Sequence, residues 1–464
     1  MLLTKATINL KRRHSGLSDS TGFFRLGNQH TTQAQLQCGY AGRDELLNAR
    51  HQPGNTKLTR IAVLNSHPIQ YFAPLYAYLN TAPDLQVTAL YLSDFSIRGG
   101  RDVGFGQEVK WNLDLLAGYR SVFLGDAAKT REPAEFWSLI ALQVWNELRS
   151  GNYDVLWLHG HNYAANLIAL MAAKSAGVSV MMRGETHLGL PSGRVKSFLR
   201  RAVMDAFYRL CDRLLAIGSA NAAFYRAMGV SKDKIFLVPY CVDNERFVRS
   251  ATLDARQRLD VRERFGVPTD RPVVLYAAKF IPRKRPGDLL EAVRRLKSNT
   301  DRPFTVLMVG SGELEHQLRA FCAEHALDNV VFTGFVNQLE LPALYGASDV
   351  FVLPSEHEPW GLAVNEAMCA SLPIVVCREL GCVADLVHDG VNGHTLAVGD
   401  VAGLACALRR LIEDEGLRRR QGQASLARIL QWGYPECLDG IRKALAGLPF
   451  GTVPATSIVC TKST

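Results

Sequence analysis

Two series of short apolar runs, separated by helical patterns, constrain the fold of this 464-residue chain more than any other feature. The runs of the second series are Val273–Ala277, Phe304–Val309, Val330–Phe332, Val350–Leu353 and Pro373–Cys377. Helical patterns lie between or after them at 286–298, 313–324, 340–346, 361–370 and 381–388. Continuous apolar strands that alternate with helices are typical of a parallel sheet covered on both faces.

The first series has the same character and begins near residue 60. Its predicted strands are Arg60–Asn65, Val87–Leu92, Val155–Leu158, Val178–Met182 and Arg213–Ile217. Its predicted helices are 74–79, 135–149, 164–176 and 195–211. The two series meet near 245–260, so we expect an α/β protein of two doubly wound domains. Ligands of such sheets bind in a cleft beyond the carboxyl ends of the strands.

The ends of the chain differ from the two series. Residues 1–57 are polar and non-periodic, which is typical of a disordered tail. The helical stretch 400–446 is longer than the second sheet needs, so we expect part of it to pack back onto the first domain. The expected divisions are a tail over 1–57, a first domain over 58–250, a second domain over 251–425, a returning C-terminal helix over 426–448 and a flexible tail over 449–464.

Composition narrows the class of protein. Hydrophobic residues make up 47% and charged residues 21%, as in globular proteins. The net charge of +9 favours an anionic partner, namely a nucleotide, a phospholipid surface or nucleic acid. The ten cysteines form no C-x-x-C pair, so we expect reduced thiols in a cytoplasmic protein. No apolar run reaches the ~18 residues of a membrane span.

The segment 355–368 places two glutamates around a predicted helix start. Glu358 lies in the loop after the strand 350–353, Gly361 lies where the helix should begin, and Glu366 lies eight residues beyond Glu358. A helix N-terminus binds phosphate groups through its free N–H groups and its dipole, and carboxylates bind hydroxyls strongly. The segment therefore predicts a binding site for a sugar nucleotide. A surface loop followed by a solvated helix is the alternative.

Basic and glycine-rich loops follow two other strands of the second series. Lys279 and Lys284 follow the strand 273–277, and at ~4 Å with an effective dielectric near 20 each cation–anion pair has a Coulomb energy of about 4 kcal/mol before desolvation. Two such cations could stabilise a departing nucleoside diphosphate, although the loop could also be solvated. Gly310 and Gly312 follow the strand 304–309, and they indicate either nucleotide approach or turn geometry.

Polar clusters follow the strands of the first series. They comprise His67, His159, His161, Arg183, Glu185 and His187. Carboxyl ends of parallel strands share one edge, so we expect these side chains to face the cleft as an acceptor side, with structural histidines as the alternative. The set does not form a persuasive zinc site. The basic, apolar-striped segment 196–213 predicts either a core-facing helix or contact with an anionic membrane.

As a set, these motifs resemble those of the retaining glycosyltransferases of family 4 (glycosyl transferases group 1), which have the GT-B architecture. The resemblance covers most of 59–440. The matching positions are Lys279, Lys284, Gly310, Gly312, Thr333–Val336, Glu358, Glu366, Asp389–Gly393 and the segment 238–243 before the interdomain linker.

The resemblance implies roles for single residues. Lys279 and Lys284 would hold the diphosphate, Glu358 would contact the transferred sugar, and Glu366 would contact the ribose. The implied donor site is completed by Gly310, Gly312, Val336, Gly361, Leu362 and Ala363. The implied catalytic candidates are Glu358, Lys284, Lys279, His161 and Glu185, and the acceptor-side candidates are His67, His161, Arg183 and His187.

The resemblance also implies a reaction. A hexosyl group would move with retention from a nucleoside diphosphate sugar to a glycan, polysaccharide or lipid-linked acceptor, without metal or other cofactor and without nucleic acid. Peripheral contact with the inner face of the membrane is part of this expectation. A sugar-nucleotide epimerase and a non-catalytic nucleotide-sugar-binding protein are the alternatives.

The chain departs from the family pattern at several positions. Lys279 stands where arginine is common, and Arg285 stands where the pattern has glycine. Glu185 falls near a usual histidine. The segment 67–71 replaces a glycine-rich acceptor loop, and 99–106 is expected to supply the missing flexibility.

Overall fold

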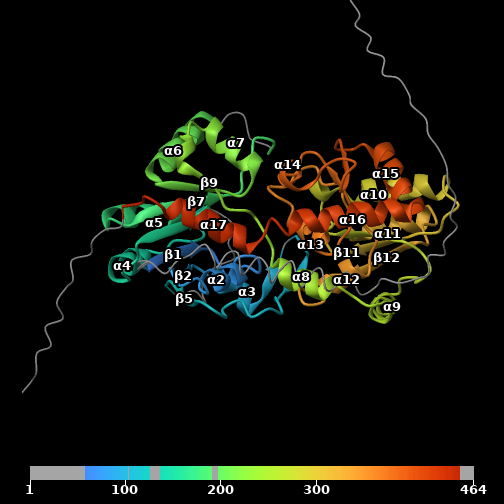
Figure 1. The fold of residues 1–464 in the computed structure, drawn as a ribbon, viewed down its shortest axis with the longest axis horizontal. Coiled ribbons are helices and arrows are strands. Elements are labelled where there is room, and N and C mark those ends of the chain that lie inside the picture. Colours follow the sequence, from blue (N-terminus) through green and yellow to red (C-terminus); the bar gives the residue numbers. More distant parts are fainter. Residues whose placement is uncertain (1–57, 103, 126–135, 191–196, 450–464) are drawn as a thin grey trace, which may run out of the picture. The chain divides into compact units, whose positions relative to one another are not determined.

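The computed structural model describes residues 58–102, 104–125, 136–190 and 197–449. The predicted tails lie outside these residues, except for residue 449. Over the described ranges the chain forms two parallel sheets flanked by helices (Figure 1). This confirms the prediction of two doubly wound α/β domains, whereas the boundaries at 250 and 425 stay predictions.

Within the described residues, seven parallel strands form the first sheet, in the order β5-β2-β1-β6-β7-β8-β9. They are β1 (Thr59–Asn65), β2 (Leu85–Tyr91), β5 (Arg120–Phe123), β6 (Val155–His159), β7 (Ser179–Gly184), β8 (Arg213–Ala216) and β9 (Ile235–Leu237). Ile61 and Val63 of β1 pack into one apolar cluster, and Ala62 and Leu64 pack into another. Both faces are covered, which explains why these strands are continuous apolar runs.

Helices from different parts of the chain cover the two faces. One face packs against α4 (Gln143–Ser150), α5 (Ala164–Ser175), α6 (Ser197–Leu210) and α7 (Ser219–Ala227). The other face packs against α2 (Ala73–Leu79). The helix predicted over 135–149 begins only at Gln143, and the described residues before it are not helical.

The second sheet has six strands among the residues described, in the order β12-β11-β10-β13-β14-β15. They are β10 (Val273–Ala277), β11 (Thr305–Val309), β12 (Val330–Gly334), β13 (Val350–Leu353), β14 (Ile374–Cys377) and β15 (Gly393–Leu396). The helices that follow these strands or each other are α10 (Pro286–Lys297), α11 (Glu315–Glu324), α12 (Leu341–Gly346), α13 (Leu362–Cys369), α14 (Val383–Leu386), α15 (Val401–Glu413) and α16 (Glu415–Ile429).

Several short or polar elements were not predicted. They are α3 (Phe95–Arg98), the hairpin of β3 (Gly100–Asp102) and β4 (Gln107–Val109), α8 (Asn244–Ala251), α9 (Ala255–Arg264), and the elements β5, β9, β15 and α7 given above. Helix α9 has no apolar stripe to reveal it. It is stabilised instead by a capping box between Asp254 and Gln257, and by ion pairs from Arg258 and Arg262 to Asp349 at 2.8 and 2.7 Å.

The last helix, α17 (Tyr434–Leu445), returns to the first sheet, as the sequence analysis expected of part of this stretch. It contacts β8, β9 and α2. Arg442 donates two hydrogen bonds to Asp84, at 2.8 and 2.5 Å, and Arg213 Nε donates to the carbonyl oxygen of Ala444 at 3.1 Å. The chain therefore passes twice between the two domains, once before α8 and once before α17.

Replacing Gly440 with alanine tests how closely α17 lies on the first sheet. A Cβ there would lie 2.0 Å from the carbonyl oxygen of Leu237 in β9, so the helix would have to move. We expect Gly440→Ala to lower the unfolding free energy by about 1–3 kcal/mol, measured by urea unfolding. Gly287→Ala is the matched control, since α10 has open space there and alanine should add about 0.5–1 kcal/mol. Unchanged stability of Gly440→Ala would contradict the close approach.

Candidate functional site

Loops at the carboxyl ends of both sheets enclose a cavity of about 470 Å³. The second domain contributes the segments after β10, β11 and β13, together with the start of α13. The first domain contributes the segment after β1, the β3–β4 hairpin and Glu185 after β7. Parallel strands end at the same edge of their sheet, which is why segments far apart in the sequence meet here.

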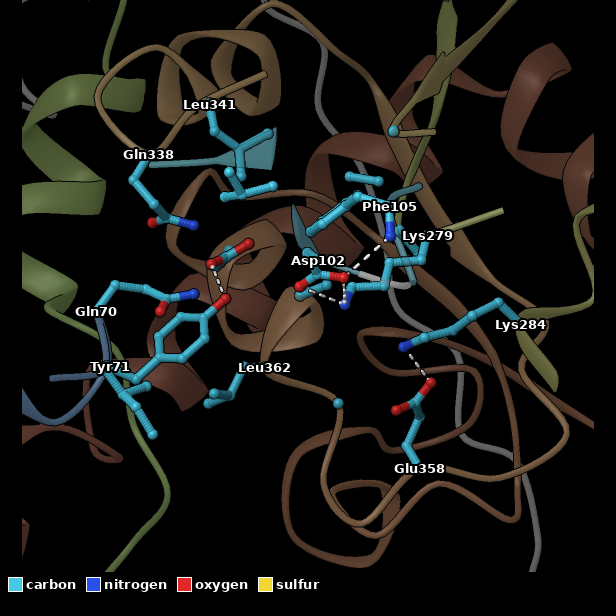
Figure 2. Close-up of a pocket in the computed structure, with 18 of the residues that line it drawn as sticks. Gln70, Tyr71, Asp102, Phe105, Lys279, Lys284, Gln338, Leu341, Glu358 and Leu362 are labelled. Atoms are coloured by element: carbon cyan, nitrogen blue, oxygen red, sulfur yellow. Dashed lines mark hydrogen bonds and ion pairs between the residues drawn. The ribbon is translucent and has the colours of Figure 1, made fainter. Parts of the chain in front are cut away.

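A buried ion-pair cluster forms one end of the cavity. Lys284 pairs with Glu358 Oε1 (Figure 2). Arg283 donates to Glu358 Oε2 at 3.1 Å. Burial raises the pKa of Glu358, but the charges and hydrogen bonds of Lys284 and Arg283 outweigh it and hold that pKa below its usual value. Burial lowers the pKa of Lys284, and Glu358 partly offsets this. Glu358 is therefore ionised at neutral pH.

Lys279 pairs with a carboxylate from the other domain. Its Nζ lies 2.7 and 2.9 Å from the two oxygens of Asp102 in β3, and 4.5 Å from the ring centroid of Phe105 (Figure 2). The hairpin is also held by Ser311, whose Oγ donates to the carbonyl oxygen of Phe105 at 2.9 Å, and by Asn337, whose Nδ2 donates to that of Lys110 at 2.8 Å. The hairpin of the first domain thus lies against the second domain over Lys279.

Helix α13 begins at the cavity. Gly361, its N-cap residue, has a φ of 103°, which a residue with a Cβ adopts only with strain. Gly361, Leu362 and Ala363 all line the cavity. The first N–H groups of a helix have no intrahelical partner, so this end offers hydrogen-bond donors beside the ion-pair cluster.

Glu366 lies in the same helix but in a different environment. It is 2% exposed and accepts hydrogen bonds from Tyr71 Oη at 3.1 Å and Tyr345 Oη at 2.8 Å. Burial raises the pKa of Glu366 to about 7, with the tyrosine hydrogen bonds acting in the opposite direction. Figure 2 shows Tyr71 and Gln338 apart from Lys284 and Glu358, at another end of the cavity. Glu358 and Glu366 therefore lie at different ends of the cavity.

The two glycines after β11 allow two loops to approach each other. A Cβ on Gly310 would lie 2.1 Å from the carbonyl oxygen of Ala278, and one on Gly312 would lie 2.6 Å from that of Phe280. Gly310 lines the cavity and Gly312 is not among its lining residues. Loop packing thus accounts for both glycines, and Gly310 additionally keeps the cavity wall free of a side chain.

Three of the first-domain candidates lie at or beside the cavity. His67 and Glu185 line it. Burial lowers the pKa of His67 to about 4, so its imidazole is neutral at pH 7, and burial raises the pKa of Glu185, against the opposing effects of Arg183 and a hydrogen bond with Tyr240. His187 Nε2 donates to the carbonyl oxygen of Glu358 at 2.9 Å, which links the two domains.

Arg183 and His161 lie outside the cavity lining. Arg183 is 2% exposed, and its guanidinium lies 5.1 Å from the ring centroid of Phe72 and 4.5 Å from that of Tyr240. His161 packs near Phe207 and Tyr208 of α6, with ring centroids 6.0 and 6.1 Å away. The catalytic and acceptor roles expected for these residues stay predictions.

Comparison with known proteins identifies the family. The family model described as "Glycosyl transferase 4-like domain" matches residues 85–241, and that described as "Glycosyl transferases group 1" matches residues 257–428. The D-inositol 3-phosphate glycosyltransferase of Xylanimonas cellulosilytica is 31% identical over 296 residues, which are 62% of this chain and 70% of that protein. The chain belongs to the group 1, family 4 glycosyltransferases.

A second relative and a solved structure extend the comparison of this glycosyltransferase. The 2-deoxystreptamine glucosyltransferase of Streptomyces kanamyceticus is 33% identical over 189 residues, 40% of this chain and about half (47%) of that protein. The crystal structure of Anabaena HepE in complex with UDP superposes with a TM-score of 0.66 at 18% identity, covering 84% of this chain and 100% of that one. Such structural likeness confirms the predicted GT-B fold.

The structure of this glycosyltransferase explains one departure from the family pattern, namely Arg285 in place of glycine. Arg285 has a left-handed backbone with a φ of 48°, which explains why glycine is usual there. Its side chain donates to both oxygens of Asp288, at 2.6 and 3.1 Å, and does not line the cavity. Of the four cations in this loop, Lys279, Arg283 and Lys284 face the cavity.

Sequence reasoning missed four residues that shape the site of this glycosyltransferase, namely Tyr71, Asp102, Gln338 and Tyr345. Tyr71 and Asp102 lie in the segments 67–71 and 99–106, which the sequence analysis considers only as a replacement for an acceptor loop and as a flexible loop. Both follow strands of the first series at the edge where the site forms, and that was the available signal. Gln338 and Tyr345 follow the Thr333–Val336 motif at the end of β12, which points to neither residue.

Two further features concern the described part of this glycosyltransferase only. Among its described residues, no group of three or more His, Cys, Asp or Glu side chains is arranged to hold a metal ion. No described helix is both long and apolar enough to span a bilayer.

Glu366→Gln tests the burial of this carboxylate in the glycosyltransferase. A folded-state pKa of about 7 exceeds the usual value of 4.5, so the stability contribution is present below about pH 4.5 and lost as pH rises through 7. We expect wild type to lose about 2 kcal/mol of unfolding free energy at this site between pH 5 and pH 8, and the variant to be spared that loss. Urea unfolding at both pH values measures it, with the exposed Glu324→Gln as control. Equal pH dependence in wild type and Glu366→Gln would refute the assignment.

Proposed function

We propose that this glycosyltransferase moves a sugar, with retention, from a nucleoside diphosphate sugar to a hydroxyl of an acceptor. The observation that carries the proposal is the cavity itself. Cations and a helix N-terminus lie at one end, and a buried carboxylate lies at another. A diphosphate fits the first and a ribose fits the second, because each end offers the complementary hydrogen-bond partners.

The diphosphate binds to Lys279, Lys284 and the start of α13, with Arg283 beside them. In the structure each of these cations pairs with a carboxylate of the chain, Asp102 or Glu358. Phosphate oxygens take the place of Asp102 on Lys279, since both are anionic oxygen acceptors. Fixed positive charge stabilises the leaving diphosphate, and the proposal needs no metal or other cofactor for this step.

Glu358 contacts the transferred sugar through its hydroxyls. Both of its oxygens are engaged by Lys284 and Arg283, which favours an orienting and electrostatic role over that of a covalent nucleophile. Retention then follows from attack on the face that the diphosphate leaves, with a phosphate oxygen accepting the proton of the acceptor hydroxyl. His67 and Glu185 line the first-domain side, where the acceptor enters.

The choice of substrates rests on the relatives. Structural neighbours were solved with UDP, and UDP with glucose, which supports a nucleotide-sugar donor. The names of the relatives given above refer to D-inositol 3-phosphate and 2-deoxystreptamine. We infer a glycan, polysaccharide or lipid-linked acceptor, and the net charge of +9 supports contact with the anionic inner face of a membrane. Incubation with labelled sugar nucleotides tests this: donor interconversion without transfer would favour an epimerase, and binding without turnover a regulator.

Lys284→Ala tests the diphosphate site. We expect at least a ~100-fold loss of transfer rate with the folded structure retained, because a preorganised charge at the leaving group is removed. Arg285→Ala is the matched control, since it removes a neighbouring cation that does not line the cavity. Rates are measured with labelled donor, and melting temperatures check folding. Near-normal transfer by Lys284→Ala would count against the donor assignment.

Asp102→Asn tests whether Asp102 competes with the diphosphate for Lys279. Removing the carboxylate charge leaves Lys279 free for phosphate, so we expect several-fold tighter binding of the nucleoside diphosphate at low salt, and a smaller gain at high salt. Asp94→Asn makes the same change of net charge at a residue that pairs with Arg98 and does not line the cavity. Calorimetry with both variants measures the difference. Weaker binding by Asp102→Asn alone would show that Asp102 supports the site instead of competing for it.

A further inference from the structure

The carboxylate of Glu366 has little free capacity to accept hydrogen bonds. An ionised carboxylate has about four acceptor positions. Tyr71 uses one on Oε1, Tyr345 uses one on Oε2, and the side chain of Gln338 also hydrogen-bonds to the group. A ribose presents two neighbouring hydroxyls. Placing both on Glu366 would crowd or displace one of the side chains already there.

Only one of the two phenols on Glu366 faces the cavity. Tyr71 lines it, whereas Tyr345 is fully buried and is not among the lining residues. Tyr71 donates its single proton to Glu366, so its oxygen remains an acceptor toward other donors. The Gln70 side chain hydrogen-bonds to the same phenol, and an oxygen with two lone pairs can still accept a second hydrogen bond.

The position of Tyr71 is fixed by the chain around it. It lies between β1 and α2, where the amides of Phe72 and Ala73 both donate to the carbonyl oxygen of Ile69, at 3.0 and 2.9 Å. Pro74 then opens α2. The phenol is therefore held at the cavity by a short, hydrogen-bonded turn of the first domain, opposite a carboxylate of the second.

We propose that Tyr71 completes the ribose subsite from the first domain: Glu366 accepts a hydrogen bond from one ribose hydroxyl, and the phenol oxygen of Tyr71 accepts one from the neighbouring hydroxyl. This rests on the proposed function, which places the ribose at Glu366. The consequence is that a vicinal diol, and not a single hydroxyl, is recognised. A donor that lacks either hydroxyl loses one of these two hydrogen bonds.

Recognition of the diol by Tyr71 and Glu366 also requires both domains. Tyr71 and Glu366 belong to different sheets, so both hydroxyls are bound only when the domains lie as they do here. The phosphate end has no such requirement, because Lys284, Arg283 and the start of α13 all belong to the second domain. Tyr71 is accordingly a specificity-determining residue for the nucleotide.

Calorimetry on the full chain tests the proposal with UDP, GDP and ADP and the 2′-deoxy and 3′-deoxy forms of each. We expect wild type to bind a ribonucleotide about tenfold or more tightly than either deoxy form. Tyr71→Phe should abolish the preference at one hydroxyl position and keep it at the other. Its affinity for the corresponding deoxynucleotide should match that of wild type. Phenylalanine retains the ring, and the melting temperature verifies folding.

Tyr345→Phe is the matched control, because it removes the other phenol from the same carboxylate. It should leave the discrimination at the hydroxyl bound by Tyr71 unchanged, since Tyr345 does not reach the cavity and can act only through Glu366. Equal changes in the ribo-to-deoxy ratio for both variants would mean that Tyr71 merely orients Glu366, and would overturn the proposal. So would a full preference at both positions in Tyr71→Phe. Failure of wild type to bind any of the diphosphates would instead refute the proposed function, and this inference with it.

Discussion

The burial of Glu358 between two cations is the interaction on which the rest of the site depends. A carboxylate that is 5% exposed is tolerated only when it is paired, and Lys284 and Arg283 supply the pairing from the loop after β10. The same contacts fix the basic loop against the loop after β13, so that cations, carboxylate and the start of α13 form one preorganised wall. Removing Lys284 or Arg283 leaves Glu358 buried with one cation fewer, and removing Glu358 leaves Lys284 buried without this partner. The ion pairs that stabilise this wall are therefore made by the same residues that the proposed function assigns to the donor.

Contacts between the domains repeat this pattern with different partners. Asp102 of the hairpin pairs with Lys279, Tyr71 donates to Glu366, and His187 donates to the carbonyl oxygen of Glu358. In each case a group of the first domain meets a residue that the family resemblance assigns to the donor. Contact between the domains and binding of the donor thus use some of the same second-domain groups. In the structure, side chains of the first domain pair with groups that a bound nucleotide would otherwise contact.

The sequence was sufficient to predict the longer apolar strands, the fold and four second-domain residues that line the cavity. Lys279, Lys284, Glu358 and Glu366 follow recognisable strands and a helix start, and parallel strands bring such positions to one edge. The pairings of Tyr71 and Asp102 could not be predicted, because they depend on how two domains meet and leave no local periodicity. Helix α9 was missed for a related reason: its stability comes from Asp349, 85 or more residues away, and not from an apolar stripe.

The two glutamates of one motif show how environment separates their chemistry. Glu358 contacts two cations, and its pKa falls despite burial. Glu366 accepts hydrogen bonds from neutral phenols, and burial raises its pKa to about 7, although those hydrogen bonds and the charge of Arg246 act in the opposite direction. A permanently ionised group suits the sugar, where positive charge develops as the diphosphate departs. A group that accepts hydrogen bonds from neutral donors suits a ribose, which carries no charge. The eight-residue spacing places the two groups on one helix and its preceding loop, but the partners they meet there give them different roles.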